Sequence, residues 1–292
     1  MAEEPLVTPT ERRFNANGME LAAQQWGHPG QRPVMALHGW LDNSASFARL
    51  APQLPDKHIV ALDLAGHGRS GHRPGTGPYN IWEDVADVFA VADQLGWERF
   101  SLLGHSRGGI IGMLAAGTFP ERIGQLAAIE ALWPEKHQCE DAPRQLARSI
   151  REIQALTEKP MTLYPDIERA IKARERGLFP LSHGAARALT ERGLEPVAGG
   201  YRWSSDQRLL APSALKLTEA HFRAFLDRST ASFCMLLGRE GVPKLFEHYR
   251  DALALFPERL QLELLPGGHH LHMEAQASSV ATILQSFFHE PD

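Results

Sequence analysis

Residues 102–109 read Leu-Leu-Gly-His-Ser-Arg-Gly-Gly and place Ser106 in a Gly-x-Ser-x-Gly frame. An apolar run from Phe100 precedes the frame and apolar residues at helical spacing follow it, which predicts a buried strand, a sharp turn and a helix. Glycines on both sides let neighbouring segments approach a serine in strained backbone geometry. The pattern therefore predicts an exposed hydroxyl at the positive end of a helix, where negative charge is stabilised.

The composition of the 292-residue chain limits the classes of protein it can be. Hydrophobic residues make up 43% and charged residues 22%, as in an ordinary soluble globular protein. The net charge of -5 disfavours nucleic acid or an anionic membrane as the main partner. Two distant cysteines, Cys139 and Cys234, give no disulfide framework, and Cys234 is expected to be a buried free thiol.

The N-terminus lacks the basic and apolar regions of a signal peptide. No apolar stretch approaches the roughly 18 to 20 residues that cross a bilayer. We therefore expect a cytoplasmic protein whose partner is a small molecule. The sequence leaves the oligomeric state open.

Apolar strands alternate with amphipathic helices in the first part of the chain, which predicts a mostly parallel sheet covered by helices on both faces. A hairpin is expected at Asn17-Gly18, and Asp42-Asn43-Ser44 is expected to cap a helix carrying Phe47, Leu50 and Leu54. The alternation stops after Glu130, and strands return only near 231–237 and 260–265. Residues 133–217 are therefore expected to form helices and loops, as a lid inserted into a core of residues 1–132 and 218–292.

A serine hydroxyl needs a base to remove its proton at neutral pH, and the chain offers fourteen histidines. After the last expected strand the chain reads Gly267-Gly268-His269-His270-Leu271-His272. A loop at a strand end is where a base can reach a serine on the same edge of the sheet. His269 is the predicted base, with His270 and His272 as alternatives.

The clustered histidines also suggest a metal site, because zinc takes three or four convergent ligands. No second cluster of carboxylates or cysteines accompanies them in the sequence. No metal site is therefore predicted, and His272 is expected to begin the final helix beside Met273.

Attack on an acyl carbon generates an oxyanion, which two backbone N–H groups can stabilise. The amide of Arg107 follows the serine at the helix N-terminus. The second donor is expected from the turn His38-Gly39-Trp40, with the amide of Trp40 favoured. The Trp40 ring is either a wall of the pocket or a packing residue.

Several ordered motifs together resemble the α/β-hydrolase fold family. They are the strand with His38-Gly39-Trp40, the segment Asp63-Leu64-Ala65-Gly66-His67-Gly68-Arg69-Ser70, the serine turn and Gly268-His269. The resemblance spans nearly the whole chain, and within the family it is greatest to lidded serine hydrolases, including the serine hydrolase-like proteins. It implies an α/β core with an inserted helical cap and the chain order nucleophile, acid, histidine.

The resemblance leaves the acid open. The family commonly places it in a Gly-x-x-Asp turn after the strand that follows the cap, but this chain reads Gly238-Arg239-Glu240-Gly241. A second family arrangement places it after the preceding strand, where this chain has Glu130. An acid at the end of a buried strand is costly unless it is paired, and a histidine that becomes cationic is such a partner. Glu130 is the predicted acid and Glu240 the alternative, although Glu130 could also be a structural anchor for the cap.

Other residues near these motifs have structural interpretations. His105 is expected to brace the serine turn rather than act as a base. Asp42 is expected to be a helix cap rather than a substrate ligand. The Arg107 side chain is expected to form a structural salt bridge rather than bind a substrate carboxylate. Trp40, His105 and Trp133 are the candidate pocket residues.

These interpretations predict a serine hydrolase that cleaves a small, fairly apolar carboxylic ester through an acyl-Ser106 intermediate, with His269, Glu130 and no cofactor. A C–C bond hydrolase, a lactonase or a perhydrolase could use the same residues, and a weakened triad would suit a ligand-binding receptor. The lid is expected to present apolar side chains to the substrate. These side chains are Trp133, Leu146, Ile150, Phe179 and Trp203.

Overall fold

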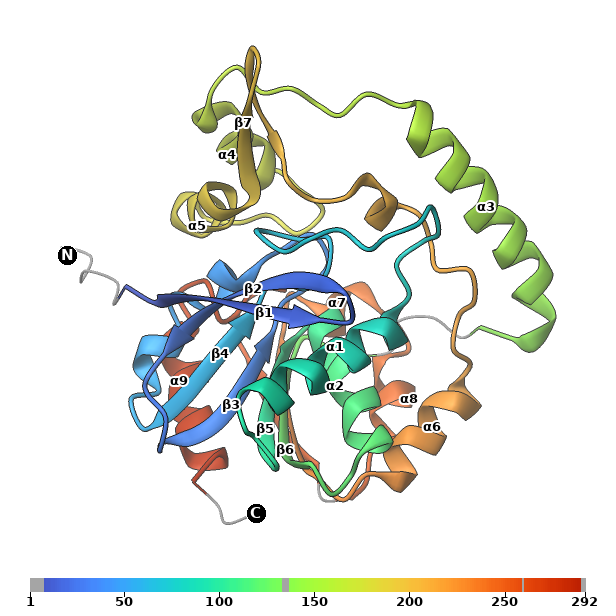
Figure 1. Ribbon diagram of the computed structural model, residues 1–292. Coiled ribbons are helices and arrows are strands. Elements are labelled where there is room, and N and C mark those ends of the chain that lie inside the picture. The colour runs from blue at the N-terminus through green and yellow to red at the C-terminus, as the bar shows by residue number, and fades with distance from the viewer. Residues whose placement is uncertain (1–7, 133–136, 259, 290–292) are drawn as a thin grey trace.

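A computed structural model describes residues 8–132, 137–258 and 260–289 of the chain. Within them, eight strands form one sheet in the spatial order β1-β2-β4-β3-β5-β6-β9-β10 (Figure 1). The strands β1, β2 and β4 pair antiparallel, and every pairing from β4 to β10 is parallel. The bounds are β1 (Thr10–Ala16), β2 (Met19–Trp26), β3 (Arg32–Leu37), β4 (Lys57–Leu62), β5 (Phe100–His105), β6 (Ile123–Ile129), β9 (Ser232–Gly238) and β10 (Gln261–Leu265). The expected mostly parallel sheet is confirmed.

Two hydrophobic clusters cover the two faces of the sheet. Alternate residues of β3 point to opposite sides, with Met35 and Leu37 in one cluster and Val34 and Ala36 in the other. Helices α1 (Ile81–Gln94), α2 (Arg107–Thr118) and α6 (Glu219–Arg228) pack into the first cluster, and α9 (Ala277–Phe287) packs into the second. Two short helices, α7 (Val242–Leu245) and α8 (Tyr249–Leu253), connect β9 to β10. The sheet is therefore buried on both faces, and its carboxyl edge is left for function.

The chain leaves the sheet after β6 and re-enters it at β9. Most of the intervening elements lie together over one edge of the core (Figure 1). They are η3 (Cys139–Asp141), α3 (Ala142–Glu158), α4 (Ile167–Glu175), α5 (His183–Gly193), β7 (Leu194–Val197), β8 (Gly200–Trp203) and η4 (Gln207–Leu210). We call residues 137–217 the overlying segment.

The expectation of helices and loops alone in this segment is wrong, because β7 and β8 form an antiparallel hairpin. The two strands meet at a tight turn in which Gly199 has φ +88° and Gly200 has φ +148°. Such backbone angles favour glycine, so the Gly199-Gly200 pair was a hairpin signal in the sequence.

Buried polar contacts attach the overlying segment to the core. Arg192 of α5 donates from Nε to both carboxylate oxygens of Asp63, at 3.0 Å each. Tyr79 donates to Asp206 at 2.8 Å, and the Asn43 side-chain amide donates to the carbonyl of Leu189 at 2.8 Å. These contacts hold the segment against the carboxyl edge of the sheet.

Two local expectations near the sheet edge are also wrong. Residues 44–54 form two 3₁₀ turns, η1 (Ser44–Phe47) and η2 (Ala51–Gln53), rather than an α-helix, because Pro52 lacks the N–H that a continuous helix needs. The cap of η1 is Asn43, whose side chain accepts from Ala45 N–H. The final helix begins at Ala277, and His272 lies fully buried before it.

Cys234 is buried, as expected, and burial raises the pKa of its thiol to about 12, whereas Cys139 is exposed. Both cysteines are free thiols. None of the helices within the described ranges combines the length and the apolar character needed to span a bilayer.

Candidate active site

Ser106 lies at a sharp turn between β5 and α2. Its backbone has φ 50° and ψ -118°, a conformation that is strained for a residue other than glycine. The turn depends on a close approach of α2 to β3, since a Cβ on Gly108 would lie 2.0 Å from the carbonyl oxygen of Leu37. The hydroxyl therefore lies at the N-terminus of α2, where unpaired backbone N–H groups favour negative charge.

His269 lies in the loop after β10, and Nδ1 of its ring is 3.1 Å from Oε2 of Glu130. A carboxylate only accepts, so Nδ1 carries the proton and the neutral ring has its lone pair on Nε2. Burial lowers the pKa of His269, while the hydrogen bond to Glu130 opposes that shift. The ring of Phe179 stacks on His269, with ring centroids 3.9 Å apart. The contact with Glu130 and the stacking on Phe179 therefore hold the imidazole in place, and burial favours its neutral form.

Glu130 ends β6, with a positive φ of 52°, and its carboxylate is fully buried. Its two oxygens accept from the backbone N–H groups of Gly238 at 2.6 Å and Val242 at 2.7 Å, in addition to His269. A Cβ on Gly241 would lie 2.1 Å from Glu130 Oε2. The Glu130 carboxylate therefore fills the space that a side chain at 241 would need.

Glu240 lies on the other side of this turn. Its carboxylate is 59% exposed and pairs with Lys244 of the same turn. The structure thus brings Glu130, and not Glu240, to the imidazole of His269.

The backbone N–H groups of Trp40 and Arg107 form no hydrogen bond to an acceptor within the described ranges. The Trp40 indole donates to the carbonyl of Leu209 at 2.9 Å, which fixes its ring beside Ser106. The Arg107 guanidinium forms an ion pair with buried Asp84, which is the structural salt bridge expected for it. The N–H of Arg107, which follows Ser106, and the N–H of Trp40, which lines the same cavity as Ser106, are therefore available to a ligand.

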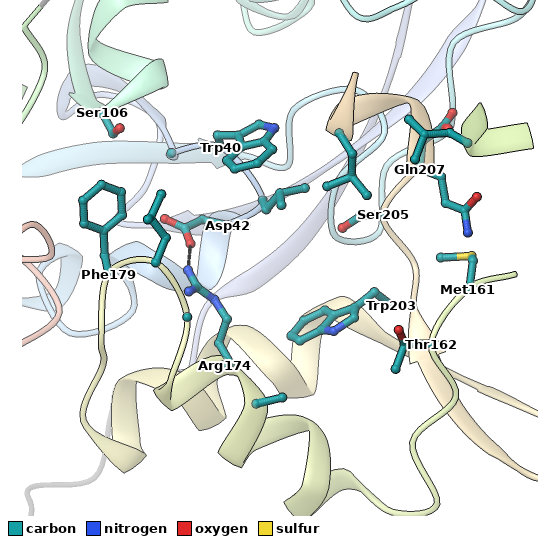
Figure 2. Close-up of a pocket in the computed structure, with 18 of the residues that line it drawn as sticks. Trp40, Asp42, Ser106, Met161, Thr162, Arg174, Phe179, Trp203, Ser205 and Gln207 are labelled. Carbon is teal, nitrogen blue, oxygen red and sulfur yellow. Dashed lines mark hydrogen bonds and ion pairs between the residues drawn. The ribbon is translucent and has the colours of Figure 1, made fainter. Parts of the chain in front are cut away.

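A cavity of about 420 Å³ opens over Ser106 and His269 (Figure 2). Figure 2 shows Phe179 and Trp203 of the overlying segment facing Trp40 of the core across this space. Trp40 and His105 line the cavity, as expected, whereas Trp133 lies outside the described residues. Leu146 and Ile150, which were expected to face the substrate, are half-exposed on α3 and do not line this cavity. Within the described residues, Leu156 is the residue of α3 that lines it.

A second cavity, of about 430 Å³, meets the first at Ser106 and Trp40. Residues of α2 and α3 line it, among them Ile110 and Arg148. Ser106 therefore lies at the junction of two chambers, and a bound molecule can place different parts on the two sides of its hydroxyl.

Asp42 is not the expected helix cap. Its buried carboxylate binds Arg174 of α4 at 2.5 Å through Oδ1 (Figure 2). Its Oδ2 lies 3.4 Å from a ring nitrogen of His105 and 3.4 Å from one of His270. Arg174 was not singled out in the sequence, because its own neighbours are those of a solvated helix. The position of Asp42, five residues after the end of β3, was the available signal for a side chain at the edge of the sheet.

His105 braces the serine turn, as expected. Its Nε2 lies 2.9 Å from the carbonyl oxygen of His269 and joins the two strand-end loops. The ring is buried, with a side chain that is 1% exposed.

Comparisons with known proteins identify the family and the fold of this chain. Residues 32–150 match the family model described as alpha/beta hydrolase fold. The chain is 31% identical to serine hydrolase-like protein 2 of Homo sapiens over 91% of this chain and 90% of that protein. It is 32% identical to a serine hydrolase-like protein of Danio rerio, over 91% and 85% of the two chains.

Among solved structures, the hypothetical protein PA1622 from Pseudomonas aeruginosa PAO1 is similar with a TM-score of 0.91 and 45% identity. That similarity covers 96% of this chain and 99% of that chain.

Proposed function

Because this chain belongs to the α/β-hydrolase family and is a serine hydrolase by its relatives, we propose that it cleaves small, fairly apolar carboxylic esters through an acyl-Ser106 intermediate. The main observation that supports this proposal is the buried contact between Glu130 and His269 beside the cavity that Ser106 lines. A Ser-His-Glu set of this kind suits acyl transfer, in which a base must both take and return one proton.

In the first step, Ser106 Oγ attacks the acyl carbon while Nε2 of His269 takes the hydroxyl proton. His269 then gives this proton to the leaving alkoxide as the C–O bond breaks. In the second step it takes a proton from water as the water oxygen attacks the acyl carbon, and it then returns that proton to Ser106 Oγ as the bond between Oγ and the acyl carbon breaks and the carboxylic acid leaves. Glu130 keeps the imidazole in the required tautomer and stabilises the imidazolium that forms in each step.

No hydrogen bond joins Ser106 to His269 within the part of the chain that is described. Such contacts are often long in a ligand-free site and shorten when substrate binds. The backbone N–H groups of Trp40 and Arg107 would receive the oxyanion. Each such donor contributes about 10²- to 10³-fold to the rate in acyl-transfer enzymes.

The two chambers support a substrate with two separate arms. Most of the larger side chains around the first chamber are apolar, which favours an apolar arm there. These side chains are Trp40, Leu41, Leu156, Met161, Phe179 and Trp203. We propose that the overlying segment acts as the lid of this site and excludes water during the reaction.

Labelling with a fluorophosphonate, followed by mass spectrometry, tests the activated serine. We expect one adduct per chain on Ser106, formed at least about 10²-fold more slowly in His269→Gln, because the base is absent. His248→Gln is the matched control, since His248 is an exposed residue directly before α8 and its substitution should leave the rate unchanged. An unmodified Ser106 in the folded wild-type protein would contradict the proposal and favour a ligand-binding receptor.

A further inference from the structure

A cluster of histidines and one aspartate lies beside the cavity, next to Ser106 and His269. We infer that Asp42, His105 and His270 form a binding site for a divalent transition-metal ion of the zinc class. The carboxylate nearest to the histidines at 269–272 in the sequence is Glu274, but the fold brings Asp42 from the loop after β3 and His105 from the end of β5 to His270.

The spacing of the three side chains fits one ion. Asp42 Oδ2 lies 3.4 Å from His105 Nδ1 and 3.4 Å from His270 Nε2, and the three ligand atoms all lie within 4.8 Å of one another. A tetrahedral zinc ion with bonds of about 2.0–2.1 Å separates its ligands by about 3.4 Å. One carboxylate and two imidazoles are a ligand set that this class of ion prefers.

The hydrogen bonding of His105 is the strongest argument for a cation. Its Nε2 lies 2.9 Å from the carbonyl oxygen of His269, which only accepts, so Nε2 carries the ring proton. When Nε2 carries the only ring proton, Nδ1 directs a lone pair at the carboxylate of Asp42, and among the described residues Nδ1 has no hydrogen-bond partner. Two buried acceptors facing each other are unfavourable unless a cation lies between them.

The structure leaves space for such an ion. Gly39 passes beside the pair, and a Cβ built on it would lie 2.8 Å from His105 Nδ1 and 3.0 Å from Asp42 Oδ2. Asp42, His105 and His270 also line the cavity over Ser106, so an ion can enter from it and a water can complete four-fold coordination. Arg174 occupies the other oxygen of Asp42 and leaves Oδ2 available.

Metal binding would affect the proposed reaction, a consequence that rests on the proposed function. The rings of His105 and His270 lie 4.8 Å and 5.2 Å from that of His269, measured between centroids. A divalent ion held by them would disfavour the imidazolium that forms on His269 during acyl transfer. We therefore expect the bound ion to inhibit ester hydrolysis.

The site is tested on the full chain, freed of metal with a chelator, by titration with Zn²⁺ and with Co²⁺ in the absence of substrate. We expect one ion per chain, the intense visible absorption of four-coordinate Co²⁺, and a melting temperature that rises with Zn²⁺ concentration. His270→Gln and Asp42→Asn should each weaken binding at least about tenfold. Circular dichroism of the metal-free variants checks that they are folded.

His183→Gln is the matched control. His183 and Glu175 form an imidazole–carboxylate pair of 2.7 Å on the exposed surface of the overlying segment, so adventitious surface chelation would use it. This variant should bind Zn²⁺ as the wild type does. Imidazole NMR of the wild type, which needs no variant, should show Zn²⁺-dependent shifts at His105 and His270 but not at His183.

Three results would overturn the inference. They are the absence of stoichiometric binding, a His270→Gln protein that binds as tightly as the wild type, and a metal-free wild type in which His105 is an imidazolium paired with Asp42. Because binding is measured without substrate, these results are independent of whether the protein hydrolyses esters. A protein that binds zinc but, after removal of the metal, hydrolyses no ester would instead contradict the proposed function alone.

Discussion

Gly241 decides where the carboxylate of this site can lie. Any side chain at 241 would collide with Glu130, because its Cβ would be 2.1–2.7 Å from the three atoms of the carboxylate group. Glu130 in turn adopts a positive φ, which costs a non-glycine residue about 1–3 kcal/mol and persists only where other contacts compensate. The two backbone N–H groups and His269 supply those contacts. The residues at 130 and 241 are therefore coupled.

Glu130→Gln is expected to lower kcat/KM for an aryl ester by about 10²-fold or more, because the neutral amide no longer stabilises the His269 imidazolium. Since the Glu130 carboxylate raises the pKa of His269, its loss should also move the acidic limb of the pH–rate profile to lower pH. Glu240→Gln, at an exposed carboxylate, is the control and should keep wild-type activity. Loss of activity in the control alone would identify Glu240 as the acid.

A relocated acid provides a second test of the same coupling. Gly241→Asp alone should lose activity and stability, because the new carboxylate meets that of Glu130. The double variant Glu130→Gly/Gly241→Asp should be at least about tenfold more active than Glu130→Gly alone. Glycine at 130 also relieves the positive φ at that position. A double variant no better than Glu130→Gly would show that the carboxylate must come from β6.

At the scale of elements, the serine turn depends on how closely α2 packs on the sheet. The close contact between Gly108 and the Leu37 carbonyl holds the N-terminus of α2 against the end of β3. Arg107 precedes Gly108 and Trp40 lies three residues after Leu37, so each proposed donor belongs to one of the two contacting segments. A small change in this packing would therefore misplace both donors.

Gly108→Ala is expected to destabilise the fold by about 2 kcal/mol or more, because the backbone of α2 must shift away from β3. Gly184→Ala is the matched control on an exposed helical glycine whose Cβ would meet nothing within 4 Å. That control should stabilise the protein by about 0.5–1 kcal/mol. Urea unfolding of both variants measures the difference, and an equal response would contradict the proposed contact.

At the scale of the whole molecule, the core holds several buried histidines whose pKa burial lowers. His38 donates from Nδ1 to the Gly39 carbonyl at 2.7 Å and accepts the Leu64 N–H on Nε2 at 2.9 Å. His67 is fully enclosed beside it, with ring centroids 5.0 Å apart. Burial lowers the pKa of both, that of His67 to well below its ordinary value. Folding therefore depends on these rings remaining unprotonated.

We expect the free energy of unfolding to fall as the pH is lowered from 7 to 5. An unfolded histidine takes up its proton near pH 6.5, while the buried rings do not, so each contributes a loss of up to about 1.4 kcal/mol per pH unit below 6.5. Their stabilising contribution is present in full only above that pH. The pKa of Asp42 is lowered below its ordinary value. The contribution of its ionised carboxylate to the free energy of unfolding is therefore lost only at a pH below the range in which the histidines act.

Urea unfolding at several pH values measures this dependence. His67→Asn keeps a donor near the Ala65 carbonyl, which His67 Nδ1 approaches at 3.0 Å, and should reduce the slope of stability against pH. His248→Gln, on the surface, should leave the slope unchanged. A His67→Asn protein with the wild-type slope would rule out this histidine as a source.

The sequence by itself determined the strands, the helices of the core and the turn that carries Ser106. These features depend on periodicity and on glycine spacing, which act between residues close together in the chain. The sequence also limited the candidates for the catalytic acid to Glu130 and Glu240, and those for the base to the histidines after β10. The roles of Ser106, His269 and Glu130 remain the proposal that the experiments above address.

Only the tertiary structure decided which distant side chains meet. Glu130 contacts His269 because β6, β9 and β10 are neighbours in the sheet, and Asp42 meets His105, His270 and Arg174 through four separate segments. The β7–β8 hairpin was missed because one glycine pair overrode the helical pattern around it. The 3₁₀ turns at 44–53 were missed because one proline, Pro52, did the same there. Contacts of this kind depend on packing across the chain, which local sequence patterns do not encode.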